Sequence, residues 1–238
     1  FSYLISLVPP SPSQLIFNMR KLVGILSVFL AASASANNPQ VEIKTSEGKI
    51  LVELFPDKAP KTVDNFLIYI KNDFYKGTIF HRTINRFVIQ GGGYTPDLKP
   101  KETLPPIPSE ATNGLTNEAG SLAMARAYDP NSATSQFFIN VERNRFLNHH
   151  KPHPDYYGYT VFGKVIQGMD VVEKISAVQT TTAGDFFQDV PVKNVIIEDV
   201  KVIPERVKAS PPSDKVKSGV KPTKSKLKTD KKKRSKNP

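Results

Sequence analysis

The sequence predicts a mainly β domain, either a mostly antiparallel barrel or a sandwich, with two α-helices covering its ends. About seven or eight short segments have the alternating or β-branched pattern of strands, whereas two segments have the spacing of a helix. Turns and loops join the strands in place of regular crossover helices, which argues against a parallel α/β sheet. We find no internal repeat that would indicate a propeller or a solenoid.

Composition limits the chemistry available to the chain. Its 238 residues suit one domain with extensions, and 39% of them are hydrophobic. There is no cysteine, which excludes disulfides, a thiol nucleophile and a cysteine-ligated metal. The formal net charge of +11 lies mostly in residues 205–238, which hold 13 Lys and Arg but 3 Asp and Glu. Residues 37–204 are therefore close to neutral.

Residues 19–36 have the pattern of a secretory signal peptide. A short basic segment precedes an apolar run of eleven residues, and small residues at 34–36 predict cleavage after Ala36. The run is too short to span a hydrocarbon layer of ~30 Å comfortably, and an uncleaved anchor is the alternative. We interpret residues 1–18 as an upstream or non-native leader. We expect an exported protein, periplasmic in a bacterium, with no membrane span after cleavage.

The first elements of the domain at 37–204 are two strands and a helix. Alternation predicts strands at 41–45 and 50–55, with a turn between them at Glu47–Gly48. Pro60 opens the helix. Its apolar stripe recurs at the spacing of one helix face, at Val63, Phe66, Leu67 and Ile70.

The next stretch combines a guanidinium, a phenyl ring and a carboxamide ahead of three glycines. Arg82, Val88 and Gln90 share a parity, so they would face one way on an extended strand. Phe87 has the opposite parity, and a bend near Asn85–Arg86 is needed to bring its ring to the same side. A cation, an aromatic wall and an amide on one side could together bind an extended peptide. The alternative is a strand with a buried Phe that ends in a glycine-rich turn.

The rest of the domain is predicted as strands, one helix and two long loops. The loops are at 94–116 and 145–157, and the helix begins at Gly168–Asp170. Further strands are expected at 135–140, 159–166 and 195–203. The second loop holds three histidines within five residues, but they lack helical spacing, so we prefer an exposed loop to a metal site at His149, His150 and His153.

Residues 205–238 are rich in Lys and hold few large apolar groups, so we expect a disordered tail. Three interpretations are open: an extension without function, non-specific contact with a polyanion, and a nuclear address, which the signal peptide disfavours. No aromatic residue is interleaved among the lysines, so stacking on nucleic-acid bases is not expected.

Five blocks resemble the cyclophilins, the family of peptidyl-prolyl cis/trans isomerases, and exported bacterial members most of all. Together they cover roughly residues 41–203, in order, at 53–66, 80–92, 120–127, 135–139 and 161–172. The resemblance implies a closed eight-stranded antiparallel β-barrel capped by two α-helices. It also implies a monomeric enzyme without cofactor or metal, which accelerates X-Pro rotation in proline-containing polypeptides during the folding of exported proteins.

By this resemblance, Arg82 is the catalytic residue. The substrate groove would be formed by Phe87, Val88, Gln90, Ala125, Arg126, Ala127, Gln136, Phe138, Phe146, Leu147 and Tyr159. Three of these depart from the common family pattern, because Phe146 stands where animal members often have Trp, Tyr159 where many have His, and Arg126 where Asn is common. The Trp position is tied to cyclosporin binding, so we expect weak affinity for cyclosporin.

The residue types suit the chemistry. Rotation about a peptide bond has a barrier of ~18–20 kcal/mol, set by amide resonance. Arg82 is always charged and can donate to the prolyl nitrogen as the amide twists. An apolar cup for the proline ring is supplied by Phe87, Val88, Phe138 and Leu147. Gln90 and Gln136 can bind the substrate backbone or hold Arg82.

Each of these residues also has a structural interpretation. Arg82 could form a surface ion pair, Phe87 and Phe138 could pack in the core, and the Gln136 amide could satisfy buried backbone groups. We interpret His81 as a structural hydrogen-bonder, since the reaction transfers no proton. The alternatives to an enzyme are a peptide-binding chaperone without turnover and an envelope protein that binds polyanions through its tail.

Overall fold

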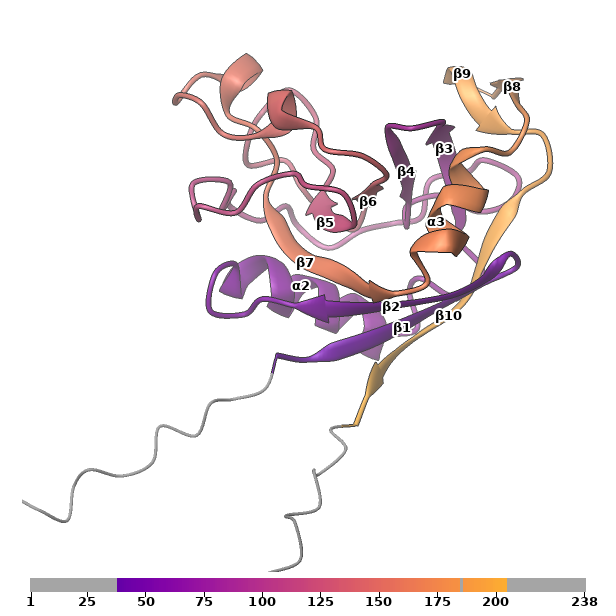
Figure 1. The fold of residues 1–238 in the computed structure, drawn as a ribbon, viewed down its shortest axis with the longest axis horizontal. Helices are drawn as coiled ribbons and strands as arrows, with labels where there is room; N and C mark the ends of the chain where they lie inside the picture. The colour runs from indigo at the N-terminus through magenta and orange to yellow at the C-terminus, as the bar shows by residue number, and fades with distance from the viewer. Residues whose placement is uncertain (1–37, 185, 205–238) are drawn as a thin grey trace, which may run out of the picture. The chain divides into compact units, whose positions relative to one another are not determined.

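Eight strands close into an antiparallel barrel in the computed structural model, which describes residues 38–184 and 186–204 (Figure 1). Around the barrel the order is β1-β10-β3-β4-β6-β5-β7-β2. These strands are β1 (Gln40–Thr45), β2 (Gly48–Leu54), β3 (Ile79–Ile84), β4 (Val88–Gly91), β5 (Ser121–Met124), β6 (Phe137–Asn140), β7 (Val161–Gln167) and β10 (Val195–Ile203). The closed barrel that the resemblance implied is confirmed, and the sandwich is excluded.

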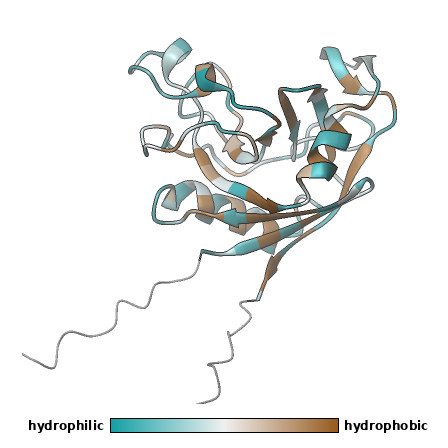
Figure 2. Cartoon of the chain, viewed as in Figure 1, coloured by the Kyte–Doolittle hydropathy of each residue, from teal (hydrophilic) through white to brown (hydrophobic). Residues whose placement is uncertain are grey.

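The barrel encloses the main hydrophobic core. Figure 2 shows hydrophobic residues along barrel strands such as β4 and β10. Phe66, Tyr75 and Phe137 form its aromatic centre, with ring centroids 5.1–5.5 Å apart in tilted or edge-on contacts. All three side chains are buried, which fixes the strands on which the site is built.

Helix α2 (Pro60–Lys71) covers part of the core through the predicted stripe, in which Val63, Phe66 and Ile70 are buried. Proline stands at its start, where a missing N–H costs no intrahelical bond. A carboxylate caps it from a distant loop, because Glu110 accepts hydrogen bonds from the backbone N–H groups of Lys61 and Thr62 at 3.1 and 2.9 Å.

Helix α3 (Met169–Ser176) begins after Gly168, whose φ of 89° lies in the left-handed region that favours glycine. The second predicted helix is therefore confirmed. Among the residues that the structure describes, no helix has the length and apolar character needed to cross a membrane.

A hairpin that the sequence reasoning did not predict follows α3. It consists of β8 (Thr180–Ala183) and β9 (Phe186–Pro191), which form a separate two-stranded sheet. The hairpin lies beside β3 (Figure 1). It therefore stands next to the strand that carries Arg82.

The stretch from Arg82 to Gln90 forms two strands and not one. β3 and β4 are joined by a turn in which Arg86 has a φ of 58°, so the expected bend is present. Arg82 and Gln90 are direct cross-strand partners. Their common face thus follows from antiparallel pairing, which replaces our argument from parity along a single strand.

The long loops are as predicted, except that the second contains two short 3₁₀ turns, η1 (Arg145–Leu147) and η2 (Pro154–Tyr156). The leader at 1–18, the signal peptide at 19–36 and the tail at 205–238 lie outside the described residues, and those assignments remain predictions.

Candidate active site

A pocket of about 110 Å³ lies on the outside of the barrel, between β3, β4, β6 and the loops that follow β5 and β6. Its walls bring together nine residues that the sequence reasoning proposed. These are Arg82, Phe87, Val88, Gln90, Ala125, Arg126, Phe138, Leu147 and Tyr159.

One wall is polar. Arg82 lies on β3 opposite Gln90 on β4, and Gln90 Nε2 donates a hydrogen bond to Gln136 Oε1 at 3.0 Å. Gln136 precedes β6, and its side chain packs against Gly93, where an added Cβ would lie 2.5 Å from Gln136 Cγ. The glycine therefore lets this amide approach closely, and the three polar side chains come from three separate segments.

The floor of the pocket is apolar. Val88 and Phe138 are 3% and 4% exposed and form a small cluster with Ala123 and Val161, apart from the main core. The Phe138 ring meets the Tyr159 ring edge-on at 5.4 Å. Phe138 thus packs in a core and lines the pocket at once, so the two interpretations that the sequence left open both hold.

Backbone hydrogen bonds hold the loops around this floor. The N–H of Ala125 donates to the carbonyl of Gln136 at 3.0 Å, and that of Tyr159 donates to Leu147 at 3.0 Å. Val141 N–H donates to the Phe87 carbonyl at 2.8 Å. Residues far apart in sequence are therefore fixed by the main chain.

Three proposed residues do not line the pocket. Gln136 contacts it through Gln90, and Ala127 is exposed at the start of the next loop. Phe146 is 68% exposed, and its ring stacks on that of Phe87 with centroids 5.5 Å apart. Phe146 therefore extends the aromatic wall outward from the pocket.

The Arg126 side chain ties two loops together, a role that sequence reasoning missed. Its Nε donates to the Gly158 carbonyl at 2.9 Å and its Nη2 to the Pro154 carbonyl at 2.8 Å. Its Nη1 donates to the carbonyls of Ala127 and Tyr128 at 2.9 and 3.0 Å. The guanidinium is thus occupied by backbone acceptors, and no local sequence signal could have revealed this role, because every residue carries a backbone carbonyl.

The charges around Arg82 include one that the sequence reasoning did not identify. Asp189 on β9 places Oδ2 3.5 Å from Arg82 Nε. His81 precedes Arg82 on β3. Burial lowers the pKa of the His81 imidazole most and the charge of Arg82 lowers it further, from 6.5 to about 4. His81 is therefore neutral at neutral pH.

The family model described as "Cyclophilin type peptidyl-prolyl cis-trans isomerase/CLD" matches residues 40–202. The chain belongs to this family. It is a cyclophilin-type peptidyl-prolyl cis-trans isomerase, and the matched range includes every residue of the pocket.

This cyclophilin has close relatives of known name. It is 54% identical over 163 residues to peptidyl-prolyl cis-trans isomerase cyp18 of Streptomyces antibioticus, covering 68% of this chain and 98% of that relative. It is 54% identical over 162 residues to peptidyl-prolyl cis-trans isomerase B of Escherichia coli, with the same coverage of both chains. It is 48% identical to isomerase A of Dickeya dadantii over 75% of this chain and 92% of that one.

Solved cyclophilin structures share the fold. A crystal structure of a Cryptosporidium parvum cyclophilin-type isomerase in the presence of the dipeptide Ala-Pro superposes with a TM-score of 0.59 at 31% identity. The similarity covers 70% of this chain and 99% of that one.

The histidines of the second loop contact loop atoms in this cyclophilin. His149 Nδ1 lies 2.8 Å from the Tyr157 carbonyl, and His153 Nδ1 accepts from Asp155 N–H at 3.3 Å. Within the described part of the chain, no three His, Asp or Glu side chains gather as a metal site would require.

Proposed function

We propose that this isomerase speeds X-Pro rotation by directing the Arg82 guanidinium at the prolyl nitrogen of a twisted amide. The observation that carries the proposal is that Arg82 lines the same pocket as Phe87, Val88, Phe138 and Leu147. The Arg82 cation beside these apolar side chains suits a proline ring whose nitrogen becomes basic as it loses resonance.

The proposed mechanism uses differential binding. In the planar ground state the prolyl nitrogen shares its lone pair with the carbonyl and is a poor acceptor. As the bond twists, the lone pair localises, and the hydrogen bond from Arg82 strengthens. Gln90, held by Gln136, stands beside Arg82 and is placed to bind the substrate backbone.

The proposed clients are exported proteins. Support comes from the signal-peptide pattern at 19–36, which predicts that the enzyme itself is exported. Expression of the full chain in a bacterium, followed by N-terminal sequencing of the protein from the periplasmic fraction, tests this. A mature terminus at Asn37 is expected, and a product confined to the cytoplasm with its leader intact would contradict export.

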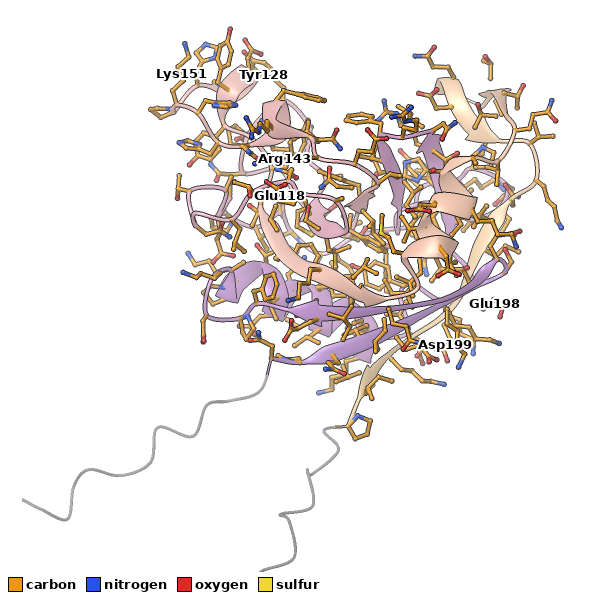
Figure 3. All side chains as sticks on the ribbon, in the orientation of Figure 1. Glu118, Tyr128, Arg143, Lys151, Glu198 and Asp199 are labelled. Atoms are coloured by element: carbon orange, nitrogen blue, oxygen red, sulfur yellow. The ribbon has the colours of Figure 1, made fainter. Side chains whose placement is uncertain are left out.

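The mechanism is tested by isomerisation of a proline-containing peptide by the full chain and by its Arg82→Ala variant. Loss of one preorganised donor lowers kcat by about 100- to 1000-fold. Arg143→Ala is the matched control, because Arg143 is a surface arginine paired with Glu118 at 2.9 Å and does not line the pocket (Figure 3). A wild-type rate in Arg82→Ala would exclude the proposed role.

A further inference from the structure

The unpredicted β8–β9 hairpin brings a carboxylate to the proposed catalytic arginine. Asp189 lies on β9, beside β3, with Oδ2 3.5 Å from Arg82 Nε. Its side chain is 20% exposed, against 37% for Arg82. In the described ranges, Asp189 is the ion-pair partner of Arg82, and it does not itself line the pocket.

Asp189 contacts Arg82 at Nε, and this position affects how the guanidinium is oriented. A guanidinium offers five N–H donors in a rigid fork, so an interaction at Nε constrains the plane of the whole group. The contact that the structure gives between the two side chains is at Nε, and not at a terminal nitrogen. A carboxylate at Nε can therefore orient the group while leaving both terminal nitrogens to the substrate.

The carboxylate is itself held in place. Asp189 has a φ of 69°, a left-handed conformation that Asp and Asn adopt more readily than other non-glycine residues. The next residue, Val190, is 3% exposed and pairs with Thr181 across the hairpin. A buried anchor next to a defined backbone conformation keeps Asp189 directed at β3.

We propose that Asp189 is a positioning residue for Arg82, whose carboxylate holds the guanidinium plane ready for the prolyl nitrogen. This inference rests on the role proposed for Arg82. At 3.5 Å the interaction is longer than an ordinary hydrogen bond, so it acts mainly through charge. Without it, Arg82 samples more rotamers, and the fraction of bound substrate that meets a correctly placed donor falls.

The test is a double-mutant cycle on the full chain, with Asp189→Asn made in the wild-type and Arg82→Ala backgrounds. Asn keeps the shape and tolerates the left-handed φ, so the charge alone is removed. We expect kcat to fall about fivefold with KM unchanged, as for a partly exposed ion pair. In the Arg82→Ala background, assayed at higher enzyme concentration, we expect no further fall.

Two further variants sharpen the comparison. Asp189→Gly removes the whole side chain at a position where glycine fits the backbone, and the same fall in kcat is expected. Asp199→Asn is the matched control, because the Asp199 carboxylate is similarly exposed at 23% and pairs with Lys201 away from the pocket (Figure 3). It should leave kcat unchanged.

The outcomes separate this inference from the role of Arg82. An equal fall in both backgrounds would make Asp189 a purely structural residue and overturn the inference, and so would an unchanged kcat in Asp189→Asn. If kcat falls in Arg82→Ala but stays at the wild-type value in Asp189→Asn, the positioning role alone is overturned. A fast Arg82→Ala overturns the catalytic role itself.

Discussion

The side-chain amide of Gln90 donates a hydrogen bond to the side-chain carbonyl of Gln136 at 3.0 Å and so links β4 to the segment that enters β6. Both residues are partly buried. Because the bond uses Gln90 Nε2, it fixes the orientation of the Gln90 side-chain amide, and Gln90 lines the pocket together with Arg82.

Replacing Gln136 by Leu should lower kcat/KM about fivefold. The substitution removes the acceptor, so the Gln90 amide loses its fixed orientation at a cost of about 1 kcal/mol. Steady-state isomerisation of a proline-containing peptide measures this. Asn148→Leu is unsuitable as a control, because the Asn148 side chain accepts a hydrogen bond from a backbone N–H of the loop. A Gln136→Leu enzyme with wild-type kcat/KM would show that the amide pair is not needed.

His81 should make stability depend on pH below neutrality. Its pKa is about 4 in the folded protein and 6.5 when unfolded, so between these values the unfolded chain binds more protons. The free energy of unfolding therefore rises with pH across this window, by about 3 kcal/mol from this group, and its contribution is constant above pH 6.5. Urea unfolding at pH 4.5 and 7.5 measures the difference.

The control for this pH dependence is His81→Phe, which keeps an aromatic ring beside Tyr94 and cannot be protonated. The fall in stability between pH 7.5 and 4.5 should be smaller in the variant. Equal falls in both proteins would mean that other groups account for the acid sensitivity.

Glu110→Ala should destabilise the fold by about 0.5–2 kcal/mol, the range measured for loss of a helix cap. The Glu110 carboxylate accepts from two N–H groups at the start of α2 and from the Thr62 hydroxyl at 2.7 Å. Equilibrium unfolding in urea reports the change. Glu118→Ala, which breaks the surface pair with Arg143, should cost less than 1 kcal/mol. Equal effects of the two substitutions would argue against a capping role.

Phe146→Trp should raise affinity for cyclosporin. Phe146 is 68% exposed and stacked on Phe87, so the position can accept a larger ring, and an indole N–H adds a hydrogen-bond donor that Phe lacks. One such bond corresponds to about three- to tenfold in the dissociation constant. Titration calorimetry measures it, with the wild-type protein, whose Phe146 has no donor, as the reference. No gain in the Trp variant would mean that other groove residues limit cyclosporin binding.

Local patterns in the sequence were sufficient to predict the elements that carry their own signal. The stripe from Val63 to Ile70 predicted α2, and Val195–Ile203 was predicted with the bounds that β10 has. The closure of the barrel came only through the resemblance to a family. Alternation indicates that a strand exists, but strand pairing depends on contacts between distant segments.

The features that sequence reasoning missed are those with weak local signals. Thr180–Ala183 is largely exposed and has no apolar alternation, so no strand was predicted at β8, and Asp189 was not identified. Glu110 caps the N–H of Thr62, which lies 48 residues earlier, beyond the reach of any local capping motif. The nine pocket residues were found through the resemblance to a family, but the carbonyls that the Arg126 side chain binds could not be read from the sequence.

The pairing of β1 with β10, with Gln40 opposite Ile203, has a consequence for synthesis on the ribosome. β1 leaves the exit tunnel first among the barrel strands, and its partner on one side is made last. Until Val195–Ile203 has emerged, that edge of β1 presents unpaired N–H and carbonyl groups. The barrel can close only after translation of the domain is essentially complete, and a chain that stops before β10 is left with an open edge.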